Sequence, residues 1–204
     1  MDFKEDLSDS TFDFARVVWP VIKKRIGGGE FMPVNNVTKL SFSQQLDKLA
    51  GVNAWQVNNN VGIRGIDIRV QYGHPYASFT ICSSGSSSNF ADFEKIVYAL
   101  QHKNEGWVTP AYTIRAYLDE RKTGKLLYVC MIKTNDLISY VNNGKPGKDW
   151  ELRDNKRDNN KFIVVWCKDL KDANVDLFEY IALGISIDYP SLKTILNNRD
   201  KEDR

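Results

Sequence analysis

The sequence has few of the residues that build metal–thiolate sites, disulfide frameworks or imidazole chemistry. It contains three cysteines, Cys82, Cys130 and Cys167, without a CxxC spacing, and two histidines, His74 and His102. Such cysteine usage indicates neither a zinc site nor a disulfide framework, and we expect buried free thiols. Neither histidine has a partner at metal-ligand spacing, so we expect both in loops or on the surface.

Long apolar runs and a strong charge of either sign are also missing. No apolar run approaches the ~20 residues of a membrane-spanning helix, and the N-terminal MDFKEDLSDS lacks the basic and apolar regions of a signal peptide. We therefore expect a cytoplasmic protein with no membrane partner. The formal net charge is +2, so only a local basic patch could argue for nucleic acid.

Length and composition are typical of one folded domain. The chain has 204 residues, of which 42% are hydrophobic and 26% charged, which is enough for a proper core. We expect a single α/β domain over residues 1–196, with a mixed β-sheet flanked by helices on both faces. The charged end, residues 197–204, is expected to be a disordered tail.

Hydrophobic periodicity and turn residues predict the order of the elements. Helices are expected at 10–26, 41–51, 90–103, 136–144 and 175–183. The first helix should be kinked or divided at Pro20 and ended by Gly27 to Gly29. Strands are expected at 52–57, 66–72 and 77–82, as a three-strand meander, then at 110–120, 126–134, 150–154 and 161–167.

One predicted strand carries a row of polar side chains. In IDIRVQY, residues 66–72, the residues Asp67, Arg69 and Gln71 alternate with apolar ones, which places all three on one face. An acid, a guanidinium and an amide in a row are what an active site would use. A half-exposed strand without chemistry has the same pattern, so both interpretations stay open.

The order of motifs resembles the PD-(D/E)XK phosphodiesterase superfamily. Its core is a helix with an acid, a strand carrying G-(I/V)-D, a strand carrying E or Q, and a helix. Residues 28–134 also resemble a family of uncharacterised prokaryotic and phage proteins with that predicted fold. The resemblance lies in GGEF-PV, LDKLAGVNAWQV, GIRG before RVQ, SFTI, DFEK and the hairpin with TIRAY and KT-DL-Y.

The resemblance implies a restriction-endonuclease-like fold and a DNA endonuclease, a phosphodiester hydrolase, that uses Mg²⁺, with Mn²⁺ as a substitute. The predicted metal ligands are Glu30, Asn53, Asp67 and Gln71, and the predicted catalytic residues are Asp67, Arg69, Gln71 and Lys95. Glu30, Asn53, Gln71 and Lys95 come from the resemblance, whereas Asp67 and Arg69 are substitutes from the neighbouring strand. The predicted nucleic-acid-binding residues are Arg64, Arg69 and Lys95. For Lys95 with its neighbour Glu94, a solvated helix face is the alternative.

The chain departs from the family pattern at positions that matter for catalysis. Asn53 replaces an Asp, Cys82 replaces an Arg, and Gly73 stands where a Lys is expected. In one interpretation Asp67 and Arg69 replace the missing groups, and the endonuclease is active. In the other, the nuclease fold has lost its chemistry and keeps a DNA-binding surface.

A further alternative is a protein-interaction module without a nucleic-acid role. Its support is the number of aromatic residues that could be exposed, among them Trp107 and Trp150. A homodimer is expected from the resemblance alone, because nucleases of this fold often pair to cut both strands. The same resemblance suggests restriction, repair or phage defence as the biological context.

Overall fold

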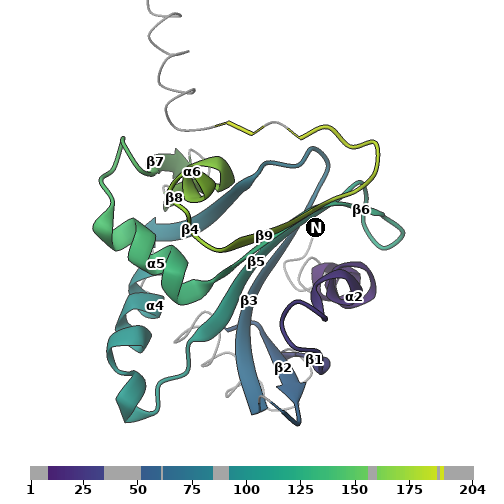
Figure 1. The fold of residues 1–204 in the computed structure, drawn as a ribbon, viewed down its shortest axis with the longest axis horizontal. Helices are drawn as coiled ribbons and strands as arrows, with labels where there is room; N and C mark the ends of the chain where they lie inside the picture. The colour runs from purple at the N-terminus through teal and green to yellow at the C-terminus, as the bar shows by residue number, and fades with distance from the viewer. Residues whose placement is uncertain are drawn as a thin grey trace, which may run out of the picture.

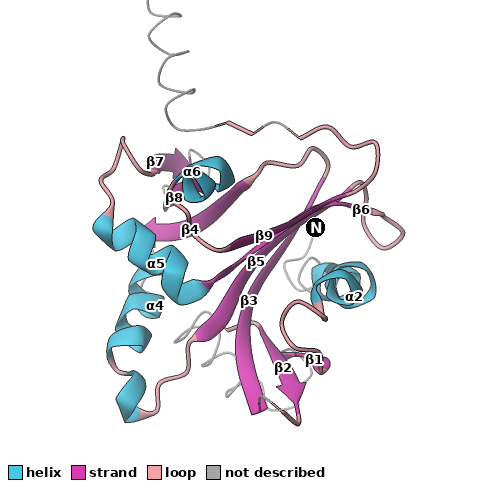
Figure 2. Ribbon diagram, in the orientation of Figure 1, coloured by secondary structure: helices cyan, strands magenta, loops and turns pink. Residues whose placement is uncertain are grey.

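The protein is a mixed α/β structure with two β-sheets (Figures 1 and 2). The computed structural model describes residues 9–34, 52–60, 62–84, 92–155, 160–187 and 189–190. The predicted helix at 41–51 and the predicted tail at 197–204 lie outside these residues. In the described ranges no helix is both long and apolar enough to cross a membrane.

The larger sheet has six strands in the order β1-β2-β3-β5-β6-β9. Their bounds are β1 Glu30–Pro33, β2 Ala54–Asn58, β3 Gly62–Tyr72, β5 Pro110–Leu118, β6 Leu126–Lys133 and β9 Leu177–Ile181. The sheet is mixed, because β3 and β5 are parallel while the other neighbours are antiparallel. The predicted hairpin of β5 and β6 is confirmed.

The smaller sheet has three antiparallel strands in the order β4-β8-β7. Their bounds are β4 Ser78–Ser84, β8 Asn160–Trp166 and β7 Glu151–Asn155. The predicted meander is therefore wrong in its third strand, because β4 pairs with β8 instead of β3. The free edge of β3 is taken by β5, and Gly73, at φ +93°, turns the chain away directly after β3.

Helices cover both faces of the larger sheet. On one side lie the π-helical segment η1 (Phe14–Val18) and α2 (Trp19–Ile22). On the other side α4 (Asp92–Gln101) and α5 (Thr134–Asn143) pack together with the smaller sheet (Figure 1). The period-two alternation of β3 and β5 separates two apolar cores, one on each side.

The N-terminal helix is continuous over residues 9–22 and changes its hydrogen-bond pattern next to Pro20, where a kink or division is predicted. Pro20 lies in the first turn of α2, directly after the π-helical segment. Proline has no N–H to bond the carbonyl four residues earlier, and the turn before it is widened, with the Trp19 N–H donating to the Phe14 carbonyl. The α-helix ends at Ile22, and a turn then leads to Gly27 to Gly29, which have φ of +92°, +82° and +96°.

The predicted helix at 175–183 is wrong. Residues Leu177–Ile181 form the edge strand β9, antiparallel to β6 (Figure 2). Pairing places Glu179 beside Cys130 in the sheet, and the hydroxyl of Tyr128 donates to the Glu179 carboxylate. The open edge of β6 and this buried hydrogen bond override the helical periodicity. A short helix not predicted, α6 (Cys167–Asp172), precedes β9.

The three thiols differ in accessibility, which gives a labelling prediction. All three are free; Cys130 and Cys167 are buried and Cys82 is partly exposed. Burial also raises the pKa of the Cys167 thiol well above its usual range. We expect a thiol reagent such as DTNB to modify only Cys82 in the native protein and all three cysteines after denaturation. Rapid native modification of two or more thiols would contradict this assignment.

Candidate functional site

Charged residues of β3 and β5 lie side by side under α4. The parallel register pairs Asp67 with Thr113 and Arg69 with Arg115. Paired residues project to the same face of a sheet, so the polar row of IDIRVQY is extended by a second polar row from TIRAYL. This face belongs to the side of the sheet that α4 and the smaller sheet cover.

Arg115 is a buried guanidinium with Asp67 as its counter-ion. Only 2% of Arg115 and 9% of Asp67 is exposed. One terminal nitrogen of Arg115 donates to the Asp67 carboxylate at 3.0 Å and to the Thr80 carbonyl at 3.1 Å, and the other donates to the Ile114 carbonyl at 2.9 Å. Burial lowers the pKa of Arg115, and the Asp67 carboxylate opposes this shift. Asp67 therefore forms a buried ion pair with Arg115.

Arg69 and Lys95 share a second carboxylate, that of Asp92. Arg69 donates to one Asp92 oxygen at 2.7 Å, and the Lys95 amine lies 3.5 Å from the other. Asp92 is in the first turn of α4, where the positive end of the helix dipole favours an anion. The exposed fractions are 34% for the Arg69 side chain, 33% for Asp92 and 15% for Lys95, so solvent reaches this pair of bonds.

We call these five residues, Asp67, Arg69, Asp92, Lys95 and Arg115, the charge cluster. It holds three cations and two carboxylates and therefore carries one net positive charge. Its inner half, Asp67 with Arg115, is buried, and its outer half is partly exposed. Such an arrangement can bind an anion at the outer half while the inner half fixes the position of β3 against β5.

Asn53, predicted as a metal ligand, uses its side-chain amide to hold the backbone of β3. Its Nδ2 donates to the Ile68 carbonyl at 2.8 Å, and its Oδ1 accepts from the Ile68 N–H at 2.9 Å. These two bonds extend the β2–β3 ladder before the first residue of β2, Ala54. Both polar atoms of the amide are therefore occupied.

The other predicted ligands lie apart from one another. Glu30 is exposed and pairs with Val57, which pairs with Ile63. Ile63 is four residues before Asp67 on β3, which is about 13 Å along the strand. Gln71 is exposed near the end of β3, where it pairs with Tyr117 of β5. No group of three or more His, Cys, Asp or Glu that could hold a metal ion is found in the described ranges.

The predicted nucleic-acid-binding residues form one pair and one separate residue. Arg69 and Lys95 meet at Asp92. Arg64 pairs with Gln56 of β2. It is five residues, an odd number, from Arg69 on β3. By the period-two rule Arg64 points to the face opposite Arg69. Any basic surface therefore contains Arg69 and Lys95 without Arg64.

Two members of the charge cluster, Asp92 and Arg115, are not among the site residues predicted from the sequence. The signal for Arg115 is the alternation of Thr113, Arg115 and Tyr117 with apolar residues, the same period as in IDIRVQY. The signal for Asp92 is weaker, because DFEK contains two acids and only the position at the helix start favours Asp92. Neither pattern identifies the partner of the charged residue.

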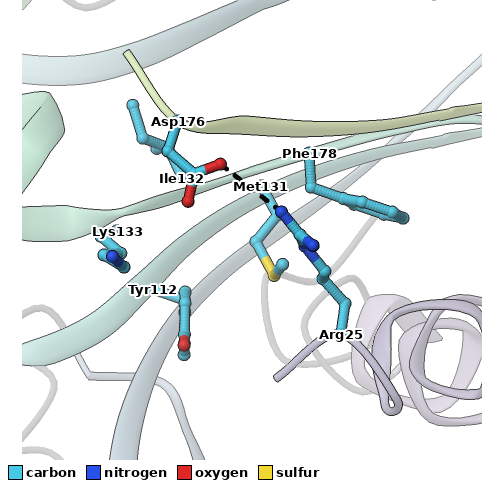
Figure 3. A pocket seen from close by; sticks show the side chains of 7 residues that line it. All are labelled: Arg25, Tyr112, Met131, Ile132, Lys133, Asp176 and Phe178. Carbon is cyan, nitrogen blue, oxygen red and sulfur yellow. Dashed lines mark hydrogen bonds and ion pairs between the residues drawn. The ribbon is translucent and has the colours of Figure 1, made fainter. Parts of the chain in front are cut away.

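A separate hollow of about 250 Å³ lies where β5, β6 and β9 meet the end of the N-terminal helix. In Figure 3 the Arg25 side chain extends past Phe178 and Met131 to Asp176, at 3.5 Å. Both charged side chains are more than half exposed, so solvent screens their attraction. None of the lining residues belongs to the charge cluster, and we take the cluster as the candidate site.

Comparisons of the chain with protein-family models, with curated proteins and with solved structures found no match.

Proposed function

We propose that the chain binds the phosphate backbone of nucleic acid through Arg69 and Lys95 of the charge cluster, without cutting it there. The observation that carries the proposal is that both cations are directed at one partly exposed carboxylate, Asp92. Arginine and lysine bind phosphate oxygens with the same charge-assisted hydrogen bonds that they make to carboxylates. A backbone phosphate can therefore compete with Asp92 for these donors.

The proposal favours a retained binding surface over a relocated endonuclease site. Asp67, the carboxylate that would replace the missing acid, already neutralises Arg115. Asn53 is occupied by the backbone of Ile68. A metal ion bound through Asp67 would compete with the buried Arg115 guanidinium for its counter-ion, and weakening a buried ion pair is costly.

The proposal also treats part of the larger sheet as a nuclease-like core. In chain order β2, β3 and β4 come before α4 and β5, and strands followed by a helix are what the resemblance leads us to expect. The strand β4, expected in the same sheet, has moved to the smaller sheet. On this proposal the ancestral catalytic face became an ion-pair network that orders the sheet and binds phosphate at its outer end.

Substitution of Asp92 is expected to raise the affinity for DNA, and this gain tests the proposal. Asp92→Asn removes the competing carboxylate charge and keeps the shape of the side chain. DNA affinity should therefore rise by about tenfold, which corresponds to ~1.4 kcal/mol of binding free energy. Arg69→Ala and Lys95→Ala should each weaken binding by about the same factor or more. Fluorescence anisotropy with a labelled oligonucleotide at low salt measures all three.

The matched control for this experiment is Asp176→Asn. It removes one negative charge from another partly exposed pair, that with Arg25, and should leave affinity nearly unchanged. Equal gains from Asp92→Asn and Asp176→Asn would assign the effect to net charge and not to the site. A loss of affinity in Asp92→Asn would contradict the proposal.

The same samples decide between binding and cleavage. With Mg²⁺ or Mn²⁺ added, we expect supercoiled, linear and single-stranded DNA to stay intact. Cutting that disappears in Gln71→Ala would overturn this part of the proposal and support the endonuclease interpretation. Gln71 suits this test because it is exposed, so its replacement leaves the fold unchanged.

A further inference from the structure

Three aromatic side chains form an exposed platform at the C-terminal end of α4. The rings of Tyr98 and His102 are stacked, with centroids 3.9 Å apart and an interplanar angle of 20°. Trp107 meets the Tyr98 ring edge-on at 5.0 Å and 79°. Tyr98 is 44% exposed and the other two are partly exposed. We call these three residues the aromatic platform.

Lys95 of the charge cluster lies one helical turn before the aromatic platform on α4. Lys95, Tyr98 and His102 are spaced by three and four residues, which aligns them along one helix face. The buried residues of α4 are Ile96 and Ala99, and Tyr98, between them in sequence, is exposed. Asp92 and Tyr98 are six residues apart, which is about 9 Å along the helix axis and about 120° around it.

Local hydrogen bonding and backbone geometry hold the aromatic platform in place. The His102 N–H donates to the Tyr98 carbonyl at 3.1 Å, and the His102 Nδ1 lies 2.8 Å from the same oxygen. Gly106, at φ +88°, follows the short 3₁₀ turn Lys103–Glu105 and returns the chain so that Trp107 reaches Tyr98. The rings are therefore positioned before any ligand arrives.

We propose that the nucleic acid bound by this chain is single-stranded, with phosphate at Arg69 and Lys95 and bases stacked on the aromatic platform. This inference rests on the proposed function. Cations beside exposed aromatic rings are the two parts of a single-strand site, because unpaired bases offer their faces for stacking. Bases within a duplex are stacked on each other and cannot reach Tyr98 or Trp107.

The test compares labelled oligothymidylate, oligouridylate and a duplex of equal length by fluorescence anisotropy. We expect both single strands to bind more tightly than the duplex, and the two arms show whether DNA or RNA is preferred. Tyr98→Ala should weaken single-strand binding by about tenfold, and Tyr98→Phe, which keeps the ring, should restore it. Tyr180→Ala is the matched control, because Tyr180 is a similarly exposed tyrosine, at 39%, on the edge strand β9.

Tryptophan fluorescence gives a second readout that a purely structural role would not produce. Base stacking should quench Trp107, and Trp107→Phe should remove most of the quenching while keeping a ring for stacking. Duplex binding as tight as single-strand binding, with no effect of Tyr98→Ala but a loss in Arg69→Ala, would overturn this inference alone. Absence of binding to every oligonucleotide would overturn the proposed function as well.

Discussion

Replacement of Asp67 by alanine is expected to lower the free energy of unfolding by about 3–5 kcal/mol, because it leaves the buried Arg115 guanidinium without a counter-ion. Arg115 is 2% exposed, and its charged contact is the Asp67 carboxylate at 3.0 Å. The two carbonyls that also accept from Arg115 cannot replace a full negative charge. Urea unfolding followed by circular dichroism measures the change.

The control is the double variant Asp67→Leu with Arg115→Met. Removing both charges and filling the space with apolar side chains should recover most of the lost stability, because neither charge is then buried alone. A single variant Asp67→Ala as stable as the wild-type protein would show that the ion pair has no structural role. It would also support a role of Asp67 as a metal ligand, because removal of the side chain would then not change the stability.

Replacement of Asp13 by alanine is expected to cost about 3–4 kcal/mol, the second-largest effect. Asp13 is fully buried. Its carboxylate accepts hydrogen bonds from the Tyr72 hydroxyl at 3.0 Å, the Lys122 N–H at 2.9 Å and the Arg16 guanidinium at 3.3 Å. The substitution leaves two of these donors partly buried without an acceptor, and hydrogen bonds to a charged group are worth ~1.5–3 kcal/mol each.

The consequence of losing Asp13 extends beyond one residue. Its bonds join the N-terminal helix to the end of β3 and to the turn between β5 and β6. Asp9→Ala is the control, because Asp9 pairs with the exposed Lys122 amine at 3.3 Å and an exposed pair contributes under ~1 kcal/mol. Equal unfolding midpoints for Asp13→Ala and Asp9→Ala would contradict this account.

Local sequence patterns predicted many of the elements but not how the strands pair. The alternation in IDIRVQY predicted a strand over 66–72, which the structure contains within β3. The same kind of evidence could not tell that β4 would pair with β8, because both possible partners are apolar strands. The helix prediction at 175–183 failed for a related reason. The strand conformation of Leu177–Ile181 depends on the edge of β6 that is free to pair with it.

The candidate site illustrates the same limit at the level of side chains. The sequence predicted that Asp67 and Arg69 share a face, but their partners are remote in the chain. Arg115 is 48 residues from Asp67, and Asp92 is 23 residues from Arg69. Which carboxylate meets which cation depends on the parallel register of β3 with β5 and on the position of α4. Neither is encoded in a local period.

The most direct test of the central claim is the affinity of the wild-type protein for a labelled single-stranded oligonucleotide at about 50 mM and 200 mM salt. Binding through Arg69 and Lys95 releases counterions from the phosphates, so we predict measurable affinity at the lower concentration and a loss of about tenfold or more at the higher one. No binding at low salt, or an affinity independent of salt, would contradict nucleic-acid binding and favour a protein partner.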